Sequence, residues 1–379
     1  MLINSIRYNG LYFIDLLMKN YLITGGAGFI GSNFIRHTLQ SFKNISITNF
    51  DALTYAGNPE NLTDLEHHFQ YQFVLGDIRD INKLRGLFEN QQFDAVIHFA
   101  AESHVDRSIQ NPSEFILTNV IGTANLLNIC LDFWNELDNE KKESFRFLHI
   151  STDEVFGSLG KDDPPFTEKT AYSPNSPYAA SKAAADHLVR AYFQTYQFPA
   201  IITNCSNNYG PFQFPEKLIP LIILNAINGR TLPLYGDGKQ IRDWLYVLDH
   251  CEALWKVLFS GLPGQTYNIG GNIQVTNLEI VNRICSILDD LIPGSPNQPH
   301  KNLITFVNDR PGHDRRYAMD TSKIKSAIGW QPRFLLDEGL LETVKWYLDH
   351  LDWIENIGNK PSYEDWINLN YAKRGKRDK

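Results

Sequence analysis

The stretch "YLITGGAGFIGS" at residues 21–32 sets the fold of the first half of the chain. Residues 21–24 are apolar and predict a buried strand, and a helix-compatible stretch follows over about 29–42. Three glycines with a spacing of three lie at and after the end of this strand: Gly25, Gly28 and Gly31. Glycine permits a tight turn and lets the backbone approach a diphosphate, while the helix N-terminus offers free N–H groups. The stretch therefore predicts a dinucleotide-binding turn.

Further apolar stretches alternate with helix-like ones up to about residue 207. The expected strands are 45–51, 71–77, 93–101, 145–152 and 199–207, and the expected helices between them are about 80–90, 113–135 and 176–197. Apolar strands that alternate with helices predict a parallel sheet covered on both faces. We therefore expect an α/β fold with a Rossmann-like, doubly wound parallel sheet.

After about residue 210 proline and glycine become frequent, and short helical patches are expected at 216–228, 247–260 and 276–291. This pattern indicates a smaller, irregular α/β domain that binds the substrate. The expected division is an extension without assigned role (1–18), an NAD-binding domain (19–207), a mainly substrate-binding part that can interleave with the first (208–350), and a tail (351–379). The basic end, "YAKRGKRDK", is expected to be solvated.

Bulk composition excludes several classes of protein. Lys and Arg number 35 and Asp and Glu 43, so the net charge of −8 argues against a nucleic-acid or anionic-membrane binder. The four cysteines are far apart without a CxxC pair, which argues against a zinc site or a disulfide framework and favours the cytoplasm. No apolar run approaches the length of a membrane span, and "LYFIDLLM" near the N-terminus is a poor signal peptide.

Acidic residues end the second and third expected strands. Asp51 is placed to accept hydrogen bonds from a ribose 2′-hydroxyl and to repel a 2′-phosphate, which favours NAD over NADP. Asp77 is placed to reach the adenine edge, and the alternative is a helix cap for the segment over about 80–90. "FAAES" at 99–103 ends the fourth strand, where backbone and small side chains would line the cofactor.

The fifth strand ends in "HISTDEVFG" at 149–157, which places two carboxylates, Asp153 and Glu154, side by side. A solvated loop is one reading, and an acid and a base that share one substrate is the other. Downstream, "YAASK" puts Tyr178 and Lys182 four residues apart on one helix face. A lysine ammonium favours the phenolate of a nearby tyrosine, which can then take a proton from a sugar hydroxyl. A chance match on a surface helix is the alternative.

These motifs resemble those of the extended short-chain dehydrogenase/reductases that act on nucleotide sugars. Within that group "STDEVFG", "NNYGPFQFPEKLIP", "YGDGKQIRDWLYVLDH" and "DRPGHDRRYAMD" look like the dTDP-glucose 4,6-dehydratases, over about residues 19–345. One departure is Phe156, where the family usually has tyrosine. The resemblance implies oxidation at C4 of dTDP-glucose, loss of water across C5 and C6, and reduction at C6. It implies Tyr178 as the C4 base, Glu154 as the C5 base and Asp153 as the acid.

Elimination itself requires such a pair, since hydroxide is a poor leaving group and needs a protonated carboxyl beside the base. Both side chains reach one sugar only if the strand has ended and the chain curls, because successive strand residues face opposite sides. Close like charges would raise one pKa. Thr152 and Ser103 are expected to contact the substrate, with capping of the strand end as the alternative.

Two sets of binding residues follow from the motifs and the resemblance. The expected NAD contacts are Gly25, Gly28, Phe29, Ile30, Gly31, Asp51, Leu53, Thr54, Asp77, Ile78, Phe99, Ala100, Ala101, Ser103, Thr118, Tyr178, Lys182 and Asn208. The expected nucleotide-sugar contacts are Ser103, Thr152, Asn207, Lys217, Leu218, Pro233, Tyr235, Arg242, Asn277, Arg310 and His313. The diphosphate requires cations. His67, His68, His98 and His104 make no metal pattern and are read as core or surface residues, and no metal is expected.

Three alternatives remain open at this stage. A nucleotide-sugar 4-epimerase would share the glycine turn, Tyr178 and Lys182 without needing two carboxylates after Thr152. A decarboxylase or a GDP-mannose dehydratase would usually lack Asp153. A non-catalytic NAD-binding scaffold would need none of these four side chains. The helices expected near 113–135 and 176–197 carry apolar faces, and the resemblance implies that they pair in a homodimer.

Overall fold

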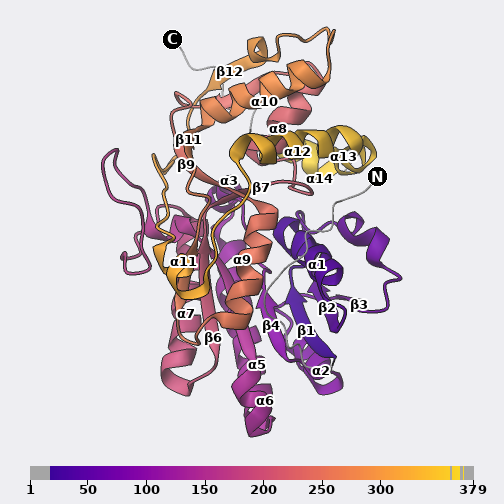
Figure 1. Ribbon diagram of the computed structural model, residues 1–379, viewed down its shortest axis with the longest axis vertical. Coiled ribbons are helices and arrows are strands. Elements are labelled where there is room, and N and C mark those ends of the chain that lie inside the picture. Colours follow the sequence, from indigo (N-terminus) through magenta and orange to yellow (C-terminus); the bar gives the residue numbers. More distant parts are fainter. Residues whose placement is uncertain (1–17, 359–360, 368–369, 371–379) are drawn as a thin grey trace.

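A computed structural model describes residues 18–358, 361–367 and 370 of the chain (Figure 1). At its centre lies a parallel sheet with the strand order β10-β6-β5-β4-β1-β2-β3. Its strands are β1 Lys19–Thr24, β2 Ile45–Asp51, β3 Tyr71–Leu75, β4 Ala95–His98, β5 Arg146–Thr152, β6 Ala200–Cys205 and β10 Thr266–Ile269. The order reverses direction between β1 and β4, which is the point where open α/β sheets bind ligands. The expected doubly wound fold is confirmed.

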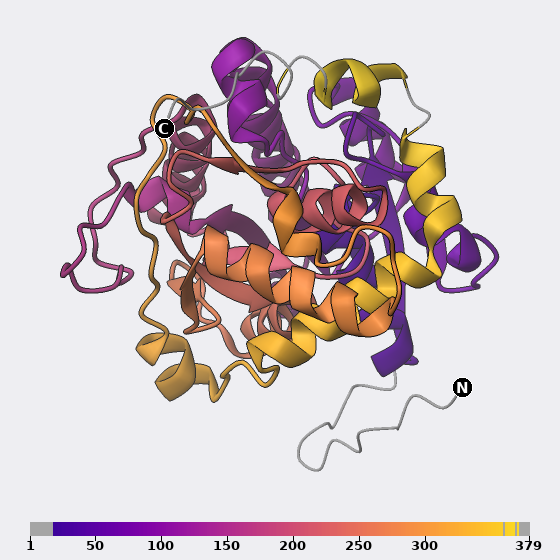
Figure 2. The ribbon, with the colours of Figure 1, turned by 90° about the horizontal axis from the view of Figure 1, so that it is seen from above.

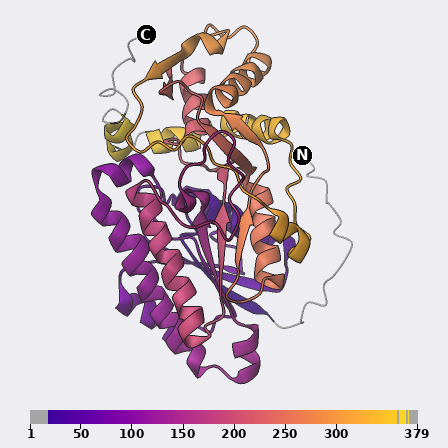
Figure 3. The same ribbon diagram turned by 90° about the vertical axis from the view of Figure 1, so that its left-hand side faces the viewer.

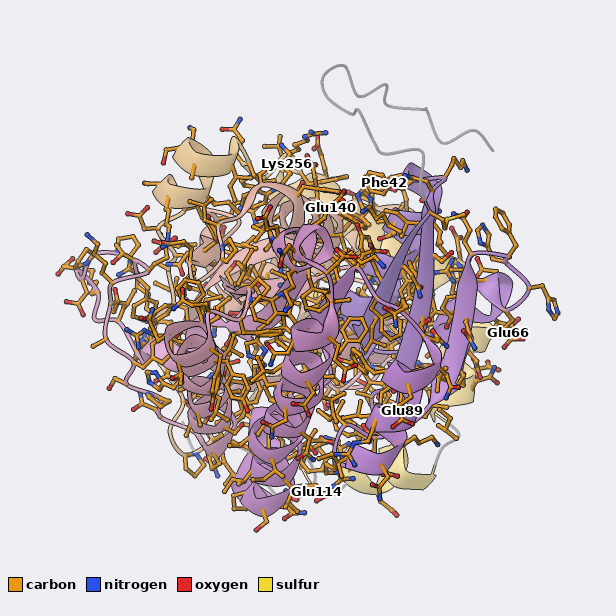
Figure 4. All side chains as sticks on the ribbon, turned by 90° about the horizontal axis from the view of Figure 1, so that it is seen from below. Phe42, Glu66, Glu89, Glu114, Glu140 and Lys256 are labelled. Carbon is orange, nitrogen blue, oxygen red and sulfur yellow. The ribbon has the colours of Figure 1, made fainter. Side chains whose placement is uncertain are left out.

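Helices cover both faces of this sheet. On one face lie α1 (Phe29–Ser41) and α9 (Val247–Ser260), and on the other lie α2 (Ile81–Asn90), α5 (Thr123–Glu136) and α7 (Pro177–Tyr196). Neighbouring strand residues serve opposite layers: Ile23 packs in the α1 and α9 layer, and Leu22 packs in the other. Figure 4 shows the two sides, with Phe42 and Lys256 on one and Glu89 and Glu114 on the other.

A long helical stretch precedes β5. It consists of α3 (Val105–Gln110), α4 (Pro112–Phe115), a π-helical segment η2 (Ile116–Gly122) and α5. The 25 residues Pro112–Glu136 are long and apolar enough to cross a membrane by length and composition. Its apolar residues do not form one continuous run, because Asn119, Asn125 and Asn128 interrupt them. Leu126, Leu127 and Cys130 are fully buried in the sheet-facing core, as in the core helix of a folded domain.

A second layer sits above the carboxyl ends of the strands (Figure 1). It contains the three-stranded sheet β11-β9-β7 and the pair β12-β8. Their bounds are β7 Asn207–Tyr209, β8 Leu232–Tyr235, β9 Ile241–Tyr246, β11 Gln274–Thr276 and β12 Ile304–Val307. The helices that complete its core are α8 Leu218–Ile227, α10 Asn277–Leu291, α12 Leu336–Asp349 and α13 Leu351–Gly358. The chain returns to the first layer to form α9 and β10.

Short helical elements lie between these strands and longer helices. They are η1 Pro59–Leu65, α6 Asn139–Ser144, η3 Asp153–Phe156, η4 His300–Leu303, α11 Ser322–Ile328 and α14 Pro361–Ile367. Residues 1–17 and the basic end at 371–379 lie outside the described residues. The helices expected at 29–42, 80–90, 176–197, 247–260 and 276–291 form within two residues of the expected bounds.

Candidate active site

The glycine turn between β1 and α1 leaves its own backbone open to close contact with a ligand. Gly25 has φ +73°, and a Cβ there would lie 2.5 Å from the backbone nitrogen of Ala100. A Cβ on Gly31 would lie 2.4 Å from the carbonyl oxygen of Gly25. The N-cap of α1 is Gly28, and no side chain caps the helix there. The first N–H groups of α1 therefore stay available to a diphosphate, which fits a dinucleotide.

Asp51 lies at the end of β2 beside this turn. Its carboxylate accepts the N–H of Ala27 and the N–H of Leu53, each at 2.8 Å. Burial raises the pKa of Asp51, and these two hydrogen bonds oppose that rise. Leu53 has φ +50° and does not line the cleft, so it contributes its backbone N–H to Asp51 instead of a side-chain contact. A carboxylate with two N–H partners still has lone pairs for ribose hydroxyls.

Asp77 is not the residue that caps helix α2. Asp80 caps α2 by accepting the N–H groups of Asn82 and Lys83. Asp77 lines the cleft and pairs with Arg79 at 2.6 Å. The alternative role for Asp77, as the cap of this helix, is therefore filled by Asp80.

One elongated cleft at the carboxyl ends of the strands collects the expected cofactor residues. Leu53 aside, every residue expected to contact NAD lines it: Gly25, Gly28, Phe29, Ile30, Gly31, Asp51, Thr54, Asp77, Ile78, Phe99, Ala100, Ala101, Ser103, Thr118, Tyr178, Lys182 and Asn208. The same cleft is lined by Glu102, Cys205, Gln213 and Glu216, which the motifs did not single out. The narrow turn, uncapped helix and buried acid fit a dinucleotide.

Helix α7 brings Tyr178 and Lys182 into the cleft. Ser176 caps the helix by accepting the N–H of Ala179, and both side chains are buried on one face. The ammonium of Lys182 donates to the carbonyl of Ile150 at 2.9 Å. Desolvation lowers the pKa of Lys182, while the negative charge of Asp186, one turn further along, raises it. The expected juxtaposition on one helix face is present.

The two carboxylates reach the same cleft because β5 ends at Thr152. The chain then turns into η3, where the hydroxyl oxygen of Thr152 accepts the N–H of Glu154 at 3.3 Å. Asp153 and Glu154 both line the cleft beside Tyr178. The geometric condition for a shared substrate is therefore met.

Different surroundings separate the two carboxylates electrostatically. Burial, and then the charge of Glu154, raises the pKa of Asp153 well above its usual range. Burial also raises the pKa of Glu154, but the positive charges of Arg310 and Lys217 oppose that rise. The pKa of Asp153 is thus shifted towards the protonated form, while the cations limit the rise in the pKa of Glu154, and a difference of this sign divides an acid from a base.

A second cavity adjoins the cleft and collects the expected nucleotide-sugar residues. It is lined by Asn207, Lys217, Leu218, Pro233, Tyr235, Arg242, Asn277, Arg310 and His313, together with Glu154. Glu154, Asn207 and Lys217 also line the first cleft, so the two cavities meet at Glu154. Ser103 and Thr152 lie on the cofactor side of this junction.

The cations of the second cavity are held in different ways. Arg242 donates to the carbonyls of Ile241 and Asp314 and lies over the ring of Tyr317. Arg310 faces Asp106 at 3.8 Å, and its buried Nε has no hydrogen-bond partner. Lys217 donates to the carbonyl of Ser103 at 3.1 Å. Arg310 therefore keeps a donor that a phosphate oxygen can use.

The histidines give no metal site. His98 is buried between the hydroxyls of Thr24 and Thr123, and His104 lines the nucleotide cavity. Over residues 18–358, 361–367 and 370, no group of three or more His, Cys, Asp and Glu side chains is placed to hold a metal ion. Asp106, which lines the same cavity as His104, was also not singled out.

The fold and the site together define a nucleotide-binding oxidoreductase-type enzyme of the short-chain dehydrogenase/reductase class, with an added acid–base pair. A family model described as GDP-mannose 4,6 dehydratase matches residues 22–343. A dTDP-glucose 4,6-dehydratase of Escherichia coli K12 is 52% identical over 361 residues, which covers 93% of this chain and 99% of that protein. The chain belongs to the family of nucleotide-sugar 4,6-dehydratases. A dTDP-glucose 4,6-dehydratase of Neisseria gonorrhoeae is 56% identical over 334 residues, which covers 88% of this chain and 96% of that protein.

Solved structures agree with this assignment. The dTDP-glucose 4,6-dehydratase of Bacillus anthracis, in complex with NAD, is 45% identical, with a TM-score of 0.79 and coverage of 89% of this chain and 99% of that chain. The dTDP-glucose 4,6-dehydratase of Streptomyces venezuelae, with NAD and TYD bound, is 44% identical, with a TM-score of 0.80 and the same coverage. The resemblance expected from the motifs is confirmed.

Proposed function

We propose that this chain is an NAD-dependent lyase that converts dTDP-glucose to dTDP-4-keto-6-deoxyglucose and water. The observation that carries the proposal is the placement of Asp153 and Glu154, both facing the cleft beside Tyr178. Relatives that are named dTDP-glucose 4,6-dehydratases over nearly their full length support the substrate.

The first step removes a hydride from C4 of the sugar and a proton from the C4 hydroxyl. NAD, when bound, supplies the hydride chemistry: it accepts a hydride from C4 and later returns it at C6. Tyr178 takes the proton of the C4 hydroxyl, with the ammonium of Lys182 on the same helix face. Burial, and then the charge of Glu154, raise the pKa of Tyr178 well above its usual range, so its phenolate must be stabilised by positive charge that arrives with the bound cofactor. Thr152 lies beside them and offers a hydroxyl to the same oxygen.

The resulting C4 ketone makes the C5 hydrogen acidic. Glu154 removes that proton, the C5–C6 double bond forms, and the C6–O bond breaks. Asp153 gives its proton to the departing C6 oxygen, which leaves as water instead of hydroxide. This assignment uses the raised pKa of Asp153 and the cations around Glu154. C5 is then reprotonated as C6 is reduced, so the cofactor is not consumed.

Arg310, Arg242 and Lys217 supply positive charge toward the diphosphate. Of these, Arg310 is the side chain with a buried donor left over. A guanidinium binds phosphate oxygens more directionally than an ammonium. The nucleotide therefore lies in the second cavity and places the sugar at the junction with the cofactor cleft.

A nucleotide-sugar 4-epimerase is the main competing function. It would use the glycine turn, Tyr178 and Lys182, but an epimerase eliminates nothing and has no use for a protonated carboxyl next to a base. The buried Asp153, with its Oδ2 unpartnered, supports elimination. A non-catalytic scaffold would leave these buried ionisable groups without a role, and burying them is costly.

We propose also that the chain acts as a homodimer in the cytoplasm. Exposed apolar side chains on α7 and on the helices beside it support the dimer: Tyr196 on α7, and Ile109, Ile116, Leu117 and Ile121 on α3 and η2. Figure 3 shows these helices side by side along one flank of the molecule. All four cysteines are buried free thiols, which supports a reducing compartment.

A substrate panel tests the function. The purified enzyme is incubated separately with dTDP-glucose, UDP-glucose and GDP-mannose, and the products are identified by mass and NMR. A 4-keto-6-deoxy product that has lost one water is expected with dTDP-glucose. Formation of a C4 epimer of the same mass would overturn the proposal. The Tyr178→Phe variant serves as the control for uncatalysed loss of water.

A further inference from the structure

The C-terminal helices lie against the loop that follows β2. This loop runs from Ala52 through η1, and it lines the cofactor cleft with Ala52, Thr54, Ala56 and Gly57. Figure 2 shows the C-terminal helices (yellow) passing along the side of the molecule that carries the early strands and loops (indigo to purple). The contacts between them are specific hydrogen bonds and ring contacts.

The central contact joins Trp353 of α13 to Asn61 of η1. The indole N–H of Trp353 donates to Oδ1 of Asn61 at 2.9 Å, and the exposed fractions of the two residues are 7% and 1%. An indole nitrogen can only donate, so the oxygen of the Asn61 amide must face it. The amide nitrogen then faces the other way and donates to the carbonyl of Ala27 at 2.9 Å.

Ala27 lies within the glycine turn, and both its backbone N–H and its backbone carbonyl are hydrogen-bonded. Its N–H donates to Asp51 at 2.8 Å, and its carbonyl also accepts the N–H of Asn58 at 3.0 Å. The backbone carbonyl of Asn61 accepts two hydrogen bonds from Arg36 of α1. A chain of hydrogen bonds thus runs from Trp353 through Asn61 to the turn that faces the diphosphate.

A second contact anchors the same loop nearer the cleft. The guanidinium of Arg107 lies 3.9 Å from the ring centre of Tyr55 and 4.2 Å from that of Trp366, between the two rings. Its Nε donates to Glu216 at 2.9 Å. Tyr55 belongs to the loop and Trp366 to α14, so Arg107 links the end of the chain to the cofactor side.

We propose that Asn61 and Trp353 are positioning residues for the dinucleotide-binding turn, and that the C-terminal helices thereby keep NAD bound between the two hydride transfers. The inference rests on the proposed function, in which the sugar is oxidised at C4 before it is reduced at C6. If the reduced cofactor dissociated after C4 oxidation, the enzyme would hold a keto sugar that it could no longer reduce at C6. Slow dissociation of NAD is therefore a requirement of the chemistry, and this bridge supplies rigidity at the turn.

The test compares two tryptophan variants in the full-length enzyme. Trp353→Phe keeps an aromatic ring but removes the N–H that orients Asn61. Trp346→Phe is the matched control, because its ring centre lies 5.1 Å from that of Trp353 in the same cluster, with no contact to the β2–β3 loop among the interactions described. The dissociation rate of NADH is measured without substrate, by displacement with excess NAD and loss of the bound fluorescence.

The expected result is dissociation about tenfold faster in Trp353→Phe, the ratio that corresponds to one lost hydrogen bond to a buried group. Asn61→Ala should give at least the same increase, and Trp346→Phe should match the wild type. Equal rates in Trp353→Phe and wild type, or equal acceleration in Trp346→Phe, would overturn the proposal. Activity is not needed, so an enzyme that fails to convert dTDP-glucose would refute the proposed function alone.

A measurement on the wild type covers the case in which the variants do not fold. Hydrogen exchange is followed with and without NAD. Residues 25–28 and α13 should gain protection together, because the Asn61 bridge joins them. Protection that appears at the turn without any change in α13 would also overturn the proposal.

Discussion

Asp153 and Glu154 have the same charge and are adjacent in sequence, yet their surroundings differ. Asp153 faces the hydroxyl of Thr152 and the charges of Glu154 and Asp243, while Glu154 faces Arg310 and Lys217. Arg242 acts on both carboxylates. The difference comes from residues that lie far apart in the sequence. The sequence therefore predicts that an acid and a base are needed, and the structure supplies the reason for assigning each role.

Replacement of Asp153 by Asn should separate oxidation from water loss. The variant keeps the shape but cannot donate a carboxyl proton, and loss of general acid catalysis typically costs 10²–10⁴-fold, so turnover should fall by about that factor. Oxidation at C4 should persist, and the reduced cofactor should accumulate and be detected by its absorbance at about 340 nm. Stopped-flow absorbance gives this measurement. A variant in which oxidation slows as much as turnover would contradict the division of roles.

Replacement of Arg310 by Gln should weaken substrate binding more than it slows chemistry. Hydrogen bonds to charged groups contribute about 1.5–3 kcal/mol, so KM should rise about 10- to 100-fold while kcat changes less than about threefold. Steady-state kinetics with dTDP-glucose gives both numbers. Arg315→Gln is the control: Arg315 is nearby in sequence but exposed and paired with Asp237. An unchanged KM in the Arg310 variant would remove that residue from the nucleotide site.

At the scale of elements, strands and helices were predicted well where apolar patterning is local. The first six strands and helix α9 lie within a few residues of their expected bounds. Strand β10 was missed because its four residues, "TYNI", lie in a part of the chain rich in turns, and only its pairing with β6 makes it a strand. The π-helical segment and the packing of Trp353 on Asn61 depend on tertiary contacts, which no local pattern encodes.

The site follows the same rule. Residues in motifs at strand ends, such as Asp51 and Asp77, were predicted to face the cofactor, and they line the cleft. Glu102 and Glu216 lie in the quoted stretches "FAAES" and "FQFPEKLIP", but neither was given a role of its own, because only the folded chain brings their side chains to the cleft. Leu53 was expected as a contact, but the turn of the backbone at φ +50° directs its N–H to Asp51.

Strand β5 carries a buried histidine whose titration affects stability. Burial lowers the pKa of His149 to about 4, and the nearby charge of Lys182 adds to this effect. The unfolded chain binds this proton near pH 6.5, so between about pH 6.5 and 4 it holds more protons than the folded one. The free energy of unfolding contributed by this group should therefore fall as the pH falls through that window, by about 2 kcal/mol between pH 6.5 and 5.0.

The His149→Gln variant isolates this contribution. Glutamine retains an N–H donor for Asp186 but does not titrate, so acidification from pH 6.5 to 5.0 should destabilise the variant about 2 kcal/mol less than the wild type. Buried carboxyl groups titrate in both proteins and cancel in the difference. Urea unfolding followed by tryptophan fluorescence measures it, with the exposed His67→Gln as control. Parallel pH profiles for wild type and His149→Gln would show that folding does not lower the pKa of His149.

At the scale of the whole molecule, the two layers meet where both cavities share Glu154, Asn207 and Lys217. The second layer is not an independent unit in the chain order, since α9 and β10 complete the first layer. The nucleotide side and the cofactor side are thus held by one continuous framework. This arrangement keeps the C4, C5 and C6 positions of a bound sugar within reach of one group of side chains.

The remaining exposed apolar surface of this framework gives the last prediction. Ile116, Leu117 and Ile121 are 52%, 45% and 47% exposed on η2, next to α7. Apolar side chains that gather on one flank of a folded chain indicate a partner surface, and a two-fold axis lets the same surface pair with itself. Leu117→Glu places a charge in that contact. By light scattering the wild type should have twice the mass of one chain, and the variant should have the mass of one chain at the same concentration.

The control for a change of charge is Lys345→Glu, which alters an exposed residue of α12 away from the proposed dimer interface. It should remain a dimer. Because α7 packs against η2 and also carries Tyr178 and Lys182, the monomeric Leu117→Glu variant should lose activity as well as mass. A wild type that is monomeric at micromolar concentration would contradict the homodimer. A Leu117→Glu variant that stays dimeric would instead show that the interface lies elsewhere than on η2.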